Sequence, residues 1–292
     1  MKVATAAYPL DWLDSWSHYE DKLARWVSDA ARAGADLLVF PEYGAMELAS
    51  LDGVDVAGDV ERSLWAVADR LEAVDQCHQT LAAEHGVHIL AASAPARFQD
   101  RPVNRARLIT PDGQTGVQDK QIMTRYERDV MRMVGGGPLR IFDTTLGKIG
   151  ILICYDSEFP LLGRALSDVD LLLVPSCTER HSGYARVRIG AMARALEAQC
   201  VSVMASLVGL APWSEVVDVN TGRGGIFGPP DRGFPMRGVL AEGEMDQPGW
   251  TMAEVDPRVI AEVRDNGDVL NRMHWAEQAG RDGPPVDTLL RR

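Results

Sequence analysis

Two short apolar runs of nearly the same sequence constrain the fold of this chain more than any other feature. Residues 35–41 read Ala-Asp-Leu-Leu-Val-Phe-Pro, and residues 169–175 read Val-Asp-Leu-Leu-Leu-Val-Pro. Each run is preceded by a helical segment, and before that by a strand-like segment that opens with a lysine, Lys2 or Lys148. A strand that is apolar at every position, rather than at alternate positions, is typical of a strand covered on both faces. The repetition therefore predicts two related strand–helix–strand halves; the alternative is a chance similarity between buried strands.

The two halves are expected to pack as two sheets face to face, with helices outside. This is an α/β fold, a four-layer α-β-β-α sandwich. In such an arrangement the strand ends at Tyr8, Glu42, Cys154 and Pro175 meet at one rim. Functional sites of open α/β sheets form at the carboxyl ends of their strands. We therefore expect a site at this rim.

The other segments fit this plan. Strands are expected at 2–8, 35–40, 87–94, 105–110, 116–120, 139–144, 149–154, 169–175, 201–206 and 250–255, and helices at 16–33, 60–85, 160–167, 183–199 and 257–264. Glycine and proline are frequent between residues 212 and 249, which predicts hairpins and loops. Whether residues 213–233 form part of a pocket lid stays open. We expect one domain over residues 1–275 and a C-terminal tail over 276–292, with a subunit interface as the suggested place for the tail.

Composition narrows the range of partners. The formal net charge of −12 argues against a surface for nucleic acid or an anionic membrane, because those surfaces need clustered Lys and Arg. No run approaches the length of a transmembrane helix, and the N-terminus lacks the pattern of a signal peptide. The four cysteines show no short paired spacing. We expect a cytoplasmic protein with free thiols.

Cys154 occupies a position that suits a nucleophile. It ends an apolar run, and Pro160 shortly after it suits the first turn of a helix. The amides of a helix N-terminus stabilise negative charge, so we expect them to favour a thiolate there. The alternative is a small core thiol, because cysteine often packs as a hydrophobe.

Three segments carry a resemblance to a known family. They are Phe40-Pro41-Glu42-Tyr43, Asp119 to Glu127, and Ile153-Cys154-Tyr155-Asp156. In this order they resemble the motifs of the nitrilase superfamily of carbon–nitrogen hydrolases, in its amidase-like branch. Residues 192–199 and 238–243 resemble two further motifs of that family, so the likeness extends from about residue 2 to about residue 275.

The resemblance implies a Glu-Lys-Cys triad. Cys154 would be the nucleophile, Glu42 the general base and acid, and Lys120 the cation that stabilises the oxyanion. Burial at a strand end would raise the pKa of Glu42 and suit it to this role. On the residues alone, Glu42 could equally cap a helix and Lys120 could be a solvated hairpin lysine.

Further residues are expected around the triad. By resemblance, Glu127 positions substrate and steadies Lys120, and the backbone N–H of Tyr155 joins the oxyanion site. Tyr43 and Thr178 are expected to support or position substrate. On the residues alone, Glu127 could be a surface partner of Arg125 or Arg128. Cys177 is expected to be a pocket or core thiol.

Glu158 departs from the family pattern. Many amidase-like members carry arginine at this place, and in some of them it binds a substrate carboxylate. The acidic residue suggests a substrate that is neutral or carries an amine at that end. The alternatives are that Glu158 pairs with Arg164 or faces a subunit interface.

The implied activity is hydrolysis of a non-peptide C–N bond in a small amide or carbamoyl compound, through a thioester on Cys154 that water resolves. The alternatives are an acyltransferase that uses the same thioester, a nitrile hydrolase and, from a different class, a catalytically silent scaffold oligomer. The segment after Cys154 lacks the Cys-Trp-Glu-Asn pattern of true nitrilases, which favours an amide. No cofactor or metal is expected. The family implies a homodimer or higher homo-oligomer, paired through the helices that follow Cys154.

Overall fold

The structure is a computed structural model that describes residues 1–281 and 283–286. Its strands are β1 Lys2–Pro9, β2 Leu37–Val39, β3 His88–Ala96, β4 Val103–Ile109, β5 Thr115–Asp119, β6 Ile141–Thr144, β7 Gly147–Ile151, β8 Leu171–Ser176, β9 Val201–Leu210, β10 Val219–Asn220, β11 Gly225–Phe227, β12 Val239–Glu242 and β13 Gly249–Glu254. Its helices are α1 Trp16–Arg32, α2 Val54–Ala57, α3 Val60–Ala68, α4 Leu71–His85, α5 Arg125–Asp129, α6 Pro160–Ala165, α7 His181–Ala198, α8 Pro257–Asn266 and α9 Asn271–His274. Three 3₁₀ turns span Gly44–Asp52, Cys154–Glu158 and Trp275–Gln278.

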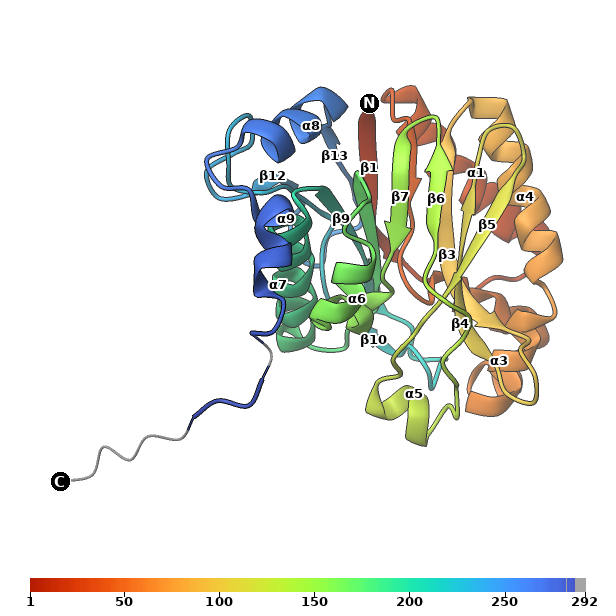
Figure 1. Cartoon of the computed structure of the whole chain (residues 1–292). Helices are drawn as coiled ribbons and strands as arrows, with labels where there is room; N and C mark the ends of the chain where they lie inside the picture. The colour runs from red at the N-terminus through yellow and green to blue at the C-terminus, as the bar shows by residue number, and fades with distance from the viewer. Residues whose placement is uncertain (282, 287–292) are drawn as a thin grey trace.

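The strands form two layers with helices outside, as expected. The main path of paired strands runs β5-β4-β3-β2-β1-β9-β8-β7-β6. In Figure 1, α1, α3 and α4 lie on one side of the strands, and α6 and α7 lie on the other. Neighbours β1, β2 and β3 are parallel, and so are β7, β8 and β9. The two halves of the chain thus repeat one arrangement.

One feature was not foreseen: hydrogen bonds join the two halves. Strands β1 and β9 pair in parallel from Ala7 opposite Ser206 to Pro9 opposite Val208. Strand β13 pairs antiparallel with β1 from Lys2 opposite Glu254 to Ala7 opposite Gly249. The two layers are therefore parts of one hydrogen-bonded sheet, joined where β1 pairs with β9.

Neighbouring residues of one strand pack into two different hydrophobic cores. Val3 and Val39 belong to the core between the two strand layers, together with Ile151 of the second half. Leu38 and Ile89 belong to the other core, beneath α1, α3 and α4. Because successive side chains of a strand point to opposite faces, a run that is apolar at every position fills both cores at once.

The prediction of one helix over residues 60–85 is wrong, because this segment forms two helices. α3 ends at Ala68 and α4 begins at Leu71. The Arg70 side chain donates to the Ala66 carbonyl at 2.8 Å, which caps α3, and pairs with Asp52 at 2.7 Å. Asp69 pairs with Arg97. The ion pairs at the break thus join Asp69 and Arg70 to partners distant in the sequence, which the spacing of apolar residues does not record.

The strand before the predicted nucleophile ends earlier than expected. β7 stops at Ile151, and Cys154 opens a 3₁₀ turn with φ of 50°. Pro160 begins α6, as the sequence predicts. The chain therefore turns sharply at Cys154 itself.

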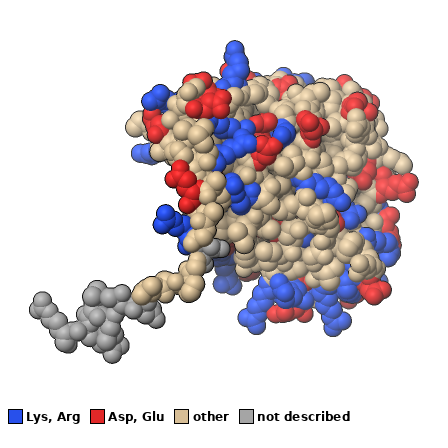
Figure 2. Space-filling view, in the orientation of Figure 1, with Lys and Arg blue, Asp and Glu red and all other residues tan. Residues whose placement is uncertain are grey.

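Charge is distributed on the surface without a large region of one sign on the face that Figure 2 shows, where Lys and Arg side chains are interspersed with Asp and Glu. Among the described residues, no helix combines the length and the apolar character needed to cross a bilayer.

Close packing of α7 on the Cys154 turn gives a first prediction. A Cβ on Gly190 would lie 2.8 Å from the Ser157 carbonyl oxygen. Gly190→Ala should gain about 1 kcal/mol of helix propensity but lose about 1–3 kcal/mol through overpacking. We expect a net loss of about 1 kcal/mol in the free energy of unfolding, measured with urea. Ala185→Gly, at an exposed position of α7, measures the propensity term alone. A more stable Gly190→Ala protein would contradict tight packing at this contact.

Candidate active site

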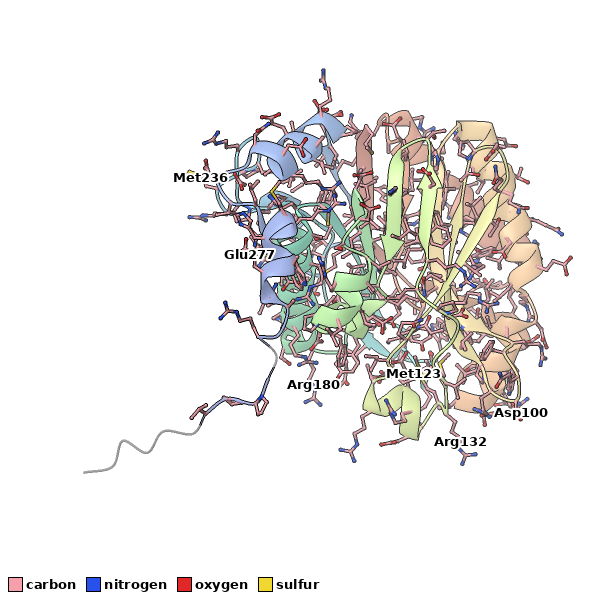
Figure 3. The ribbon with its side chains drawn as sticks, in the orientation of Figure 1. Asp100, Met123, Arg132, Arg180, Met236 and Glu277 are labelled. Carbon is pink, nitrogen blue, oxygen red and sulfur yellow. The ribbon has the colours of Figure 1, made fainter. Side chains whose placement is uncertain are left out.

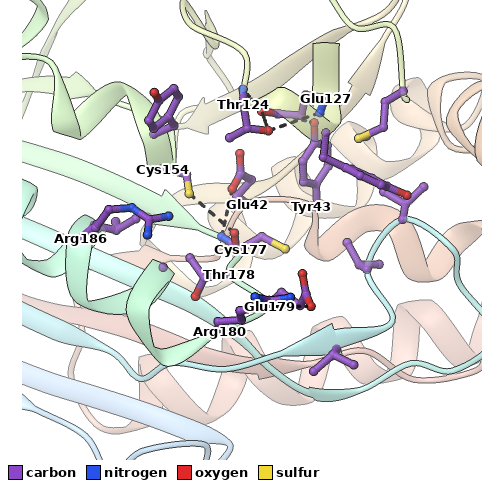
Figure 4. A pocket seen from close by; sticks show the side chains of 18 of the residues that line it. Glu42, Tyr43, Thr124, Glu127, Cys154, Cys177, Thr178, Glu179, Arg180 and Arg186 are labelled. Carbon is purple, nitrogen blue, oxygen red and sulfur yellow. Dashed lines mark hydrogen bonds and ion pairs between the residues drawn. The ribbon is translucent and has the colours of Figure 1, made fainter. Parts of the chain in front are cut away.

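The expected rim holds a pocket of about 620 Å³. Figure 4 shows its residues from close by. Glu42 follows β2, Lys120 follows β5, Cys154 follows β7, and Cys177 follows β8. Arg180, at the mouth, projects from the lower edge of the molecule in Figure 3. Four strand ends from both halves therefore meet at one cavity.

Two of the four residues expected at the rim, Tyr8 and Pro175, do not line this pocket, although Cys177, just beyond the end of β8, does. Tyr8 lies on β1 beneath α1, where its hydroxyl donates to Glu47 at 2.8 Å. Lys22 of α1 pairs with the same carboxylate at 2.6 Å. Tyr8 therefore belongs to a buried polar cluster under the helix, and the expectation for it was wrong.

A buried lysine between two carboxylates forms the centre of the site. Lys120 Nζ lies 2.7 Å from Glu42 Oε1, and 2.8 and 2.7 Å from the two oxygens of Glu127. None of the three side chains is more than 4% exposed. Lys120 is thus not a solvated hairpin lysine, and Glu127 is not a surface partner of Arg125 or Arg128.

The two carboxylates have pKa values that move in opposite directions. Burial, opposed by Lys120 and reinforced by Glu127, raises the pKa of Glu42 to about 7. Burial would also raise the pKa of Glu127, but Lys120 and the hydrogen bonds around Glu127 outweigh it, so that pKa is lowered. Glu127 therefore stays ionised beside Lys120, and Glu42 can exchange a proton near neutral pH.

Local sequence explains the position of Glu127. Thr124 caps α5, and Glu127 completes a capping box by accepting from the Thr124 amide at 2.9 Å. The Tyr43 hydroxyl donates to Glu127 Oε1 at 2.7 Å. Tyr43 itself has φ of 56°, at the start of the 3₁₀ turn after Glu42.

The surroundings of Cys154 favour the protonated thiol. Burial and the charge of Glu42 raise its pKa well above the usual value and outweigh Lys120. The expectation that helix amides would favour a thiolate is therefore wrong, because desolvation and the neighbouring carboxylate dominate. The Sγ atom lies 3.7 Å from the Cys177 carbonyl oxygen. A nucleophile at this place needs a base, and Glu42 is the adjacent base.

Sequence reasoning missed Asn104 of β4. Its amide donates to Glu42 Oε1 at 2.9 Å, and its backbone carbonyl accepts from the Lys120 amide at 2.8 Å. Ser93 of β3 donates to the Asn104 side-chain oxygen at 2.6 Å. The Cys177 amide donates to the other Glu42 oxygen at 3.0 Å. An asparagine beside the apolar run of a predicted strand is the sequence signal that could have indicated a buried polar partner for the site.

Asp156 was also missed as a structural residue. Its carboxylate accepts from the amides of Gln121 and Ile122, at 3.0 and 2.9 Å. Burial, opposed by Lys120, raises its pKa to about 6. Asp156 thereby ties the turn that carries Cys154 to the segment that carries Lys120.

The other expected residues line the pocket. The Tyr155 ring packs edge-on against Phe159, with centroids 4.8 Å apart. Thr178 donates to the Thr221 carbonyl at 2.7 Å. Glu158 lies 3.5 Å from Arg186 of α7, so the proposed pair with Arg164 is wrong. Arg164 instead packs against the Trp275 ring.

Only part of the glycine- and proline-rich loop reaches the pocket. Residues 215–219 line it, and the Tyr126 hydroxyl of α5 donates to the Glu215 carbonyl at 2.9 Å. Residues 225–227 instead form β11, which pairs with β9 and β12. Within the described part of the chain, no group of three His, Cys, Asp or Glu side chains is arranged to hold a metal ion.

Asn104 provides a test of the site. Asn104→Ala removes a donor to the charged form of Glu42, so the pKa of Glu42 should rise by about one unit, because a hydrogen bond to a charged group contributes about 1.5–3 kcal/mol. Because the Cys154 thiol holds its proton near neutral pH, alkylation by iodoacetamide needs ionised Glu42 to take that proton as the sulfur reacts. The alkylation rate should therefore rise with the ionisation of Glu42, through about pH 7 in the wild type and through a higher pH in the variant.

Peptide mapping by mass spectrometry measures this rate. The surface thiol Cys77, in the same samples, is the internal reference, and its profile should not change. An unchanged Cys154 profile in Asn104→Ala would show that Asn104 does not tune Glu42.

Comparisons with known proteins agree with the motifs. The family model described as carbon-nitrogen hydrolase matches residues 2–228. A Bacillus subtilis protein described as probable hydrolase YhcX is 31% identical over 272 residues, which are 92% of this chain and 52% of that protein. The chain thus spans about half the length of that relative. A deaminated glutathione amidase of Synechocystis sp. (strain PCC 6803) is 26% identical over 250 residues, which are 80% of this chain and 85% of that protein.

The fold has solved counterparts as well. Saccharomyces cerevisiae Nit3, described as a member of branch 10 of the nitrilase superfamily, superposes with a TM-score of 0.70 at 20% identity, over 91% of this chain and 93% of that one. This likeness confirms the expected four-layer fold.

Proposed function

We propose that this chain, which belongs to the carbon–nitrogen hydrolase family, hydrolyses a non-peptide C–N bond in a small amide or carbamoyl compound through a thioester on Cys154. The observation that carries the proposal is the Lys120 ammonium held between Glu42 and Glu127 in the pocket that contains the Cys154 thiol. The name of the Synechocystis relative, an amidase, supports an amide substrate.

In the first half of the proposed reaction, Glu42 removes the proton from Cys154 as the sulfur attacks the carbonyl carbon. Lys120 and the backbone N–H of Tyr155 donate hydrogen bonds to the oxygen that becomes negative. Glu42 then gives its proton to the leaving nitrogen, and ammonia or an amine departs. A carboxyl group with a pKa of about 7 can both accept and return a proton near neutral pH.

In the second half, Glu42 takes a proton from water, and the hydroxide attacks the thioester. The carbon–sulfur bond then breaks, the acid product is released, and Glu42 returns its proton to the sulfur, so that both Glu42 and Cys154 are restored. Glu127 keeps its negative charge throughout and holds Lys120 in place. Burial and the two carboxylates have opposite effects on the pKa of Lys120; the carboxylates prevail and raise it well above its usual value, so the donor stays charged.

The central test uses intact-mass spectrometry and ammonia release, with a panel of small amides, carbamoyl compounds and nitriles. The wild type should form an acyl adduct and release ammonia with water as the only acceptor. Cys154→Ala should show neither, and Cys77→Ala should behave as the wild type because Cys77 lies outside the pocket. Turnover that survives in Cys154→Ala would exclude the thioester. A need for an added amine acceptor would indicate an acyltransferase.

Glu127 offers a prediction of opposite sign to that for Asn104. In Glu127→Gln, loss of the charge that helps raise the pKa of Glu42 should move the acid limb of kcat/KM from about pH 7 to lower pH. The value of kcat should fall by about 10²–10³-fold, because Lys120 is then held by one carboxylate and placed less well for the oxyanion. Full activity with an unshifted pH profile would show that Glu127 neither raises the pKa of Glu42 nor positions Lys120.

We also propose a homodimer that pairs through α6 and α7. Leu161 of α6 and Ile189 of α7 are 80% and 65% exposed, and Leu196 lies two turns after Ile189 on the same helix face. Light scattering should give twice the chain mass for the wild type and a lower mass for Ile189→Glu. A dimer that is unaffected by this change would place the interface elsewhere.

The proposed setting is the cytoplasm. All four cysteines have free thiols, which supports a reducing compartment.

A further inference from the structure

The ion pair between Glu158 and Arg186 is unlike its neighbours. Arg188, two residues further along α7, donates to both oxygens of Glu242, at 2.6 and 3.1 Å. Arg186 approaches Glu158 through one contact of 3.5 Å, and neither side chain takes part in a hydrogen bond among the described residues. A guanidinium has five N–H donors, and a carboxylate can accept several hydrogen bonds. The pair therefore keeps almost all of its binding capacity.

That capacity faces the pocket. Both residues line the cavity that contains Cys154, and Glu158 ends the 3₁₀ turn that Cys154 begins. In Figure 4 the Arg186 guanidinium points into the pocket. The Arg186 side chain is 61% exposed and that of Glu158 is 22% exposed, so a ligand can reach both. The cation that the family pattern places at position 158 is thus supplied here from α7, next to an anion.

The surrounding charges decide which ligands such a pair accepts. Outside this pair and the buried Lys120 with its two carboxylates, the charged residues that line the pocket are Glu179, Arg180, Glu215 and Asp218, so the rest of its wall has more negative than positive groups. A ligand with only a carboxylate would meet Arg186 but also Glu158 and this acidic wall. A ligand with only an ammonium would meet Glu158 and the acidic wall but would be repelled by Arg186 and leave its guanidinium unpaired. A ligand that carries both charges close together can match both members of the pair.

We propose that Glu158 and Arg186 form the specificity site for a zwitterionic substrate, in which Glu158 binds an ammonium group and Arg186 binds a carboxylate. The substrate class is an amide or carbamoyl compound whose far end is an α-amino acid group. This inference rests on the proposed hydrolysis at Cys154. It revises the expectation from position 158 alone, which pointed to a substrate without a carboxylate.

Four compounds of equal chain length test the inference. Each has a terminal primary amide, and the other end carries an ammonium and a carboxylate on one carbon, the carboxylate alone, the ammonium alone, or neither. Ammonia release gives kcat/KM for each compound. The wild type should prefer the zwitterion by at least about tenfold, because this factor corresponds to one additional charged contact of about 1.4 kcal/mol.

Single substitutions should change the ranking in opposite ways. Glu158→Gln should make the carboxylate-only compound the best substrate, and Arg186→Gln should do the same for the ammonium-only compound. The double exchange Glu158→Arg with Arg186→Glu should recover a preference for the zwitterion over both singly charged compounds. Arg125→Gln, on the exposed surface of α5, removes one positive charge outside the pocket and should leave the ranking unchanged.

Binding separates failure of this inference from failure of the proposed function. Calorimetric titration of the same four compounds into Cys154→Ala reports charge selection without turnover, and the zwitterion should bind most tightly there too. Selective binding without turnover in the wild type would support the specificity site and overturn the hydrolysis. Turnover that depends on Cys154 but has no preference for the zwitterion, or a ranking that neither glutamine variant changes, would overturn the inference and leave the hydrolysis standing.

Discussion

The site depends on one interaction, the ammonium of Lys120 buried between Glu42 and Glu127. A buried charge is strongly unfavourable unless it is paired and hydrogen-bonded. Here two carboxylates share one cation, so the three groups carry an excess negative charge that must be placed somewhere. Hydrogen bonds from Thr124 and Tyr43 stabilise that charge on Glu127. Glu42 is left with a raised pKa and becomes the group that can exchange a proton.

The fold brings Glu42, Lys120 and Cys154 together although they are far apart in the sequence. Glu42 and Lys120 come from the first half of the chain, and Cys154 from the second. Pairing of β1 with β9 brings the two halves together at the same end of the sheets as the pocket. Asp156 then fixes the Cys154 turn to the Lys120 segment through two backbone amides. The placement of Glu42, Lys120 and Cys154 around one pocket thus follows from backbone pairing and backbone hydrogen bonds, which suits the preorganisation that the proposed reaction needs.

In this arrangement the residues proposed to carry out the reaction are separate from the residues proposed to select the substrate. Glu42, Lys120 and Cys154 are almost fully buried, and burial is one cause of the shifts in their pKa values. Glu158 and Arg186 lie nearer to solvent, and their side chains keep free hydrogen-bonding capacity. With the roles proposed above, a change at this outer pair alters which substrate is held and leaves Glu42, Lys120 and Cys154 in place. A family with one reaction and many substrates is compatible with this division.

The sequence by itself determined the strands, their burial on both faces and the kinds of group at their ends. The two repeated runs predict the layers, because apolar residues at every position can only fill two cores. The three motifs single out Glu42, Lys120 and Cys154 through their resemblance to the nitrilase superfamily, whereas each residue taken alone left a structural alternative open. Only the tertiary structure decided what each side chain touches. Asn104 lies 62 residues from Glu42, and Arg186 comes to Glu158 from another helix. The protonated state of Cys154 and the break between α3 and α4 likewise result from burial and from partners distant in the sequence. Local spacing does not record such contacts, because they arise only when the layers have packed.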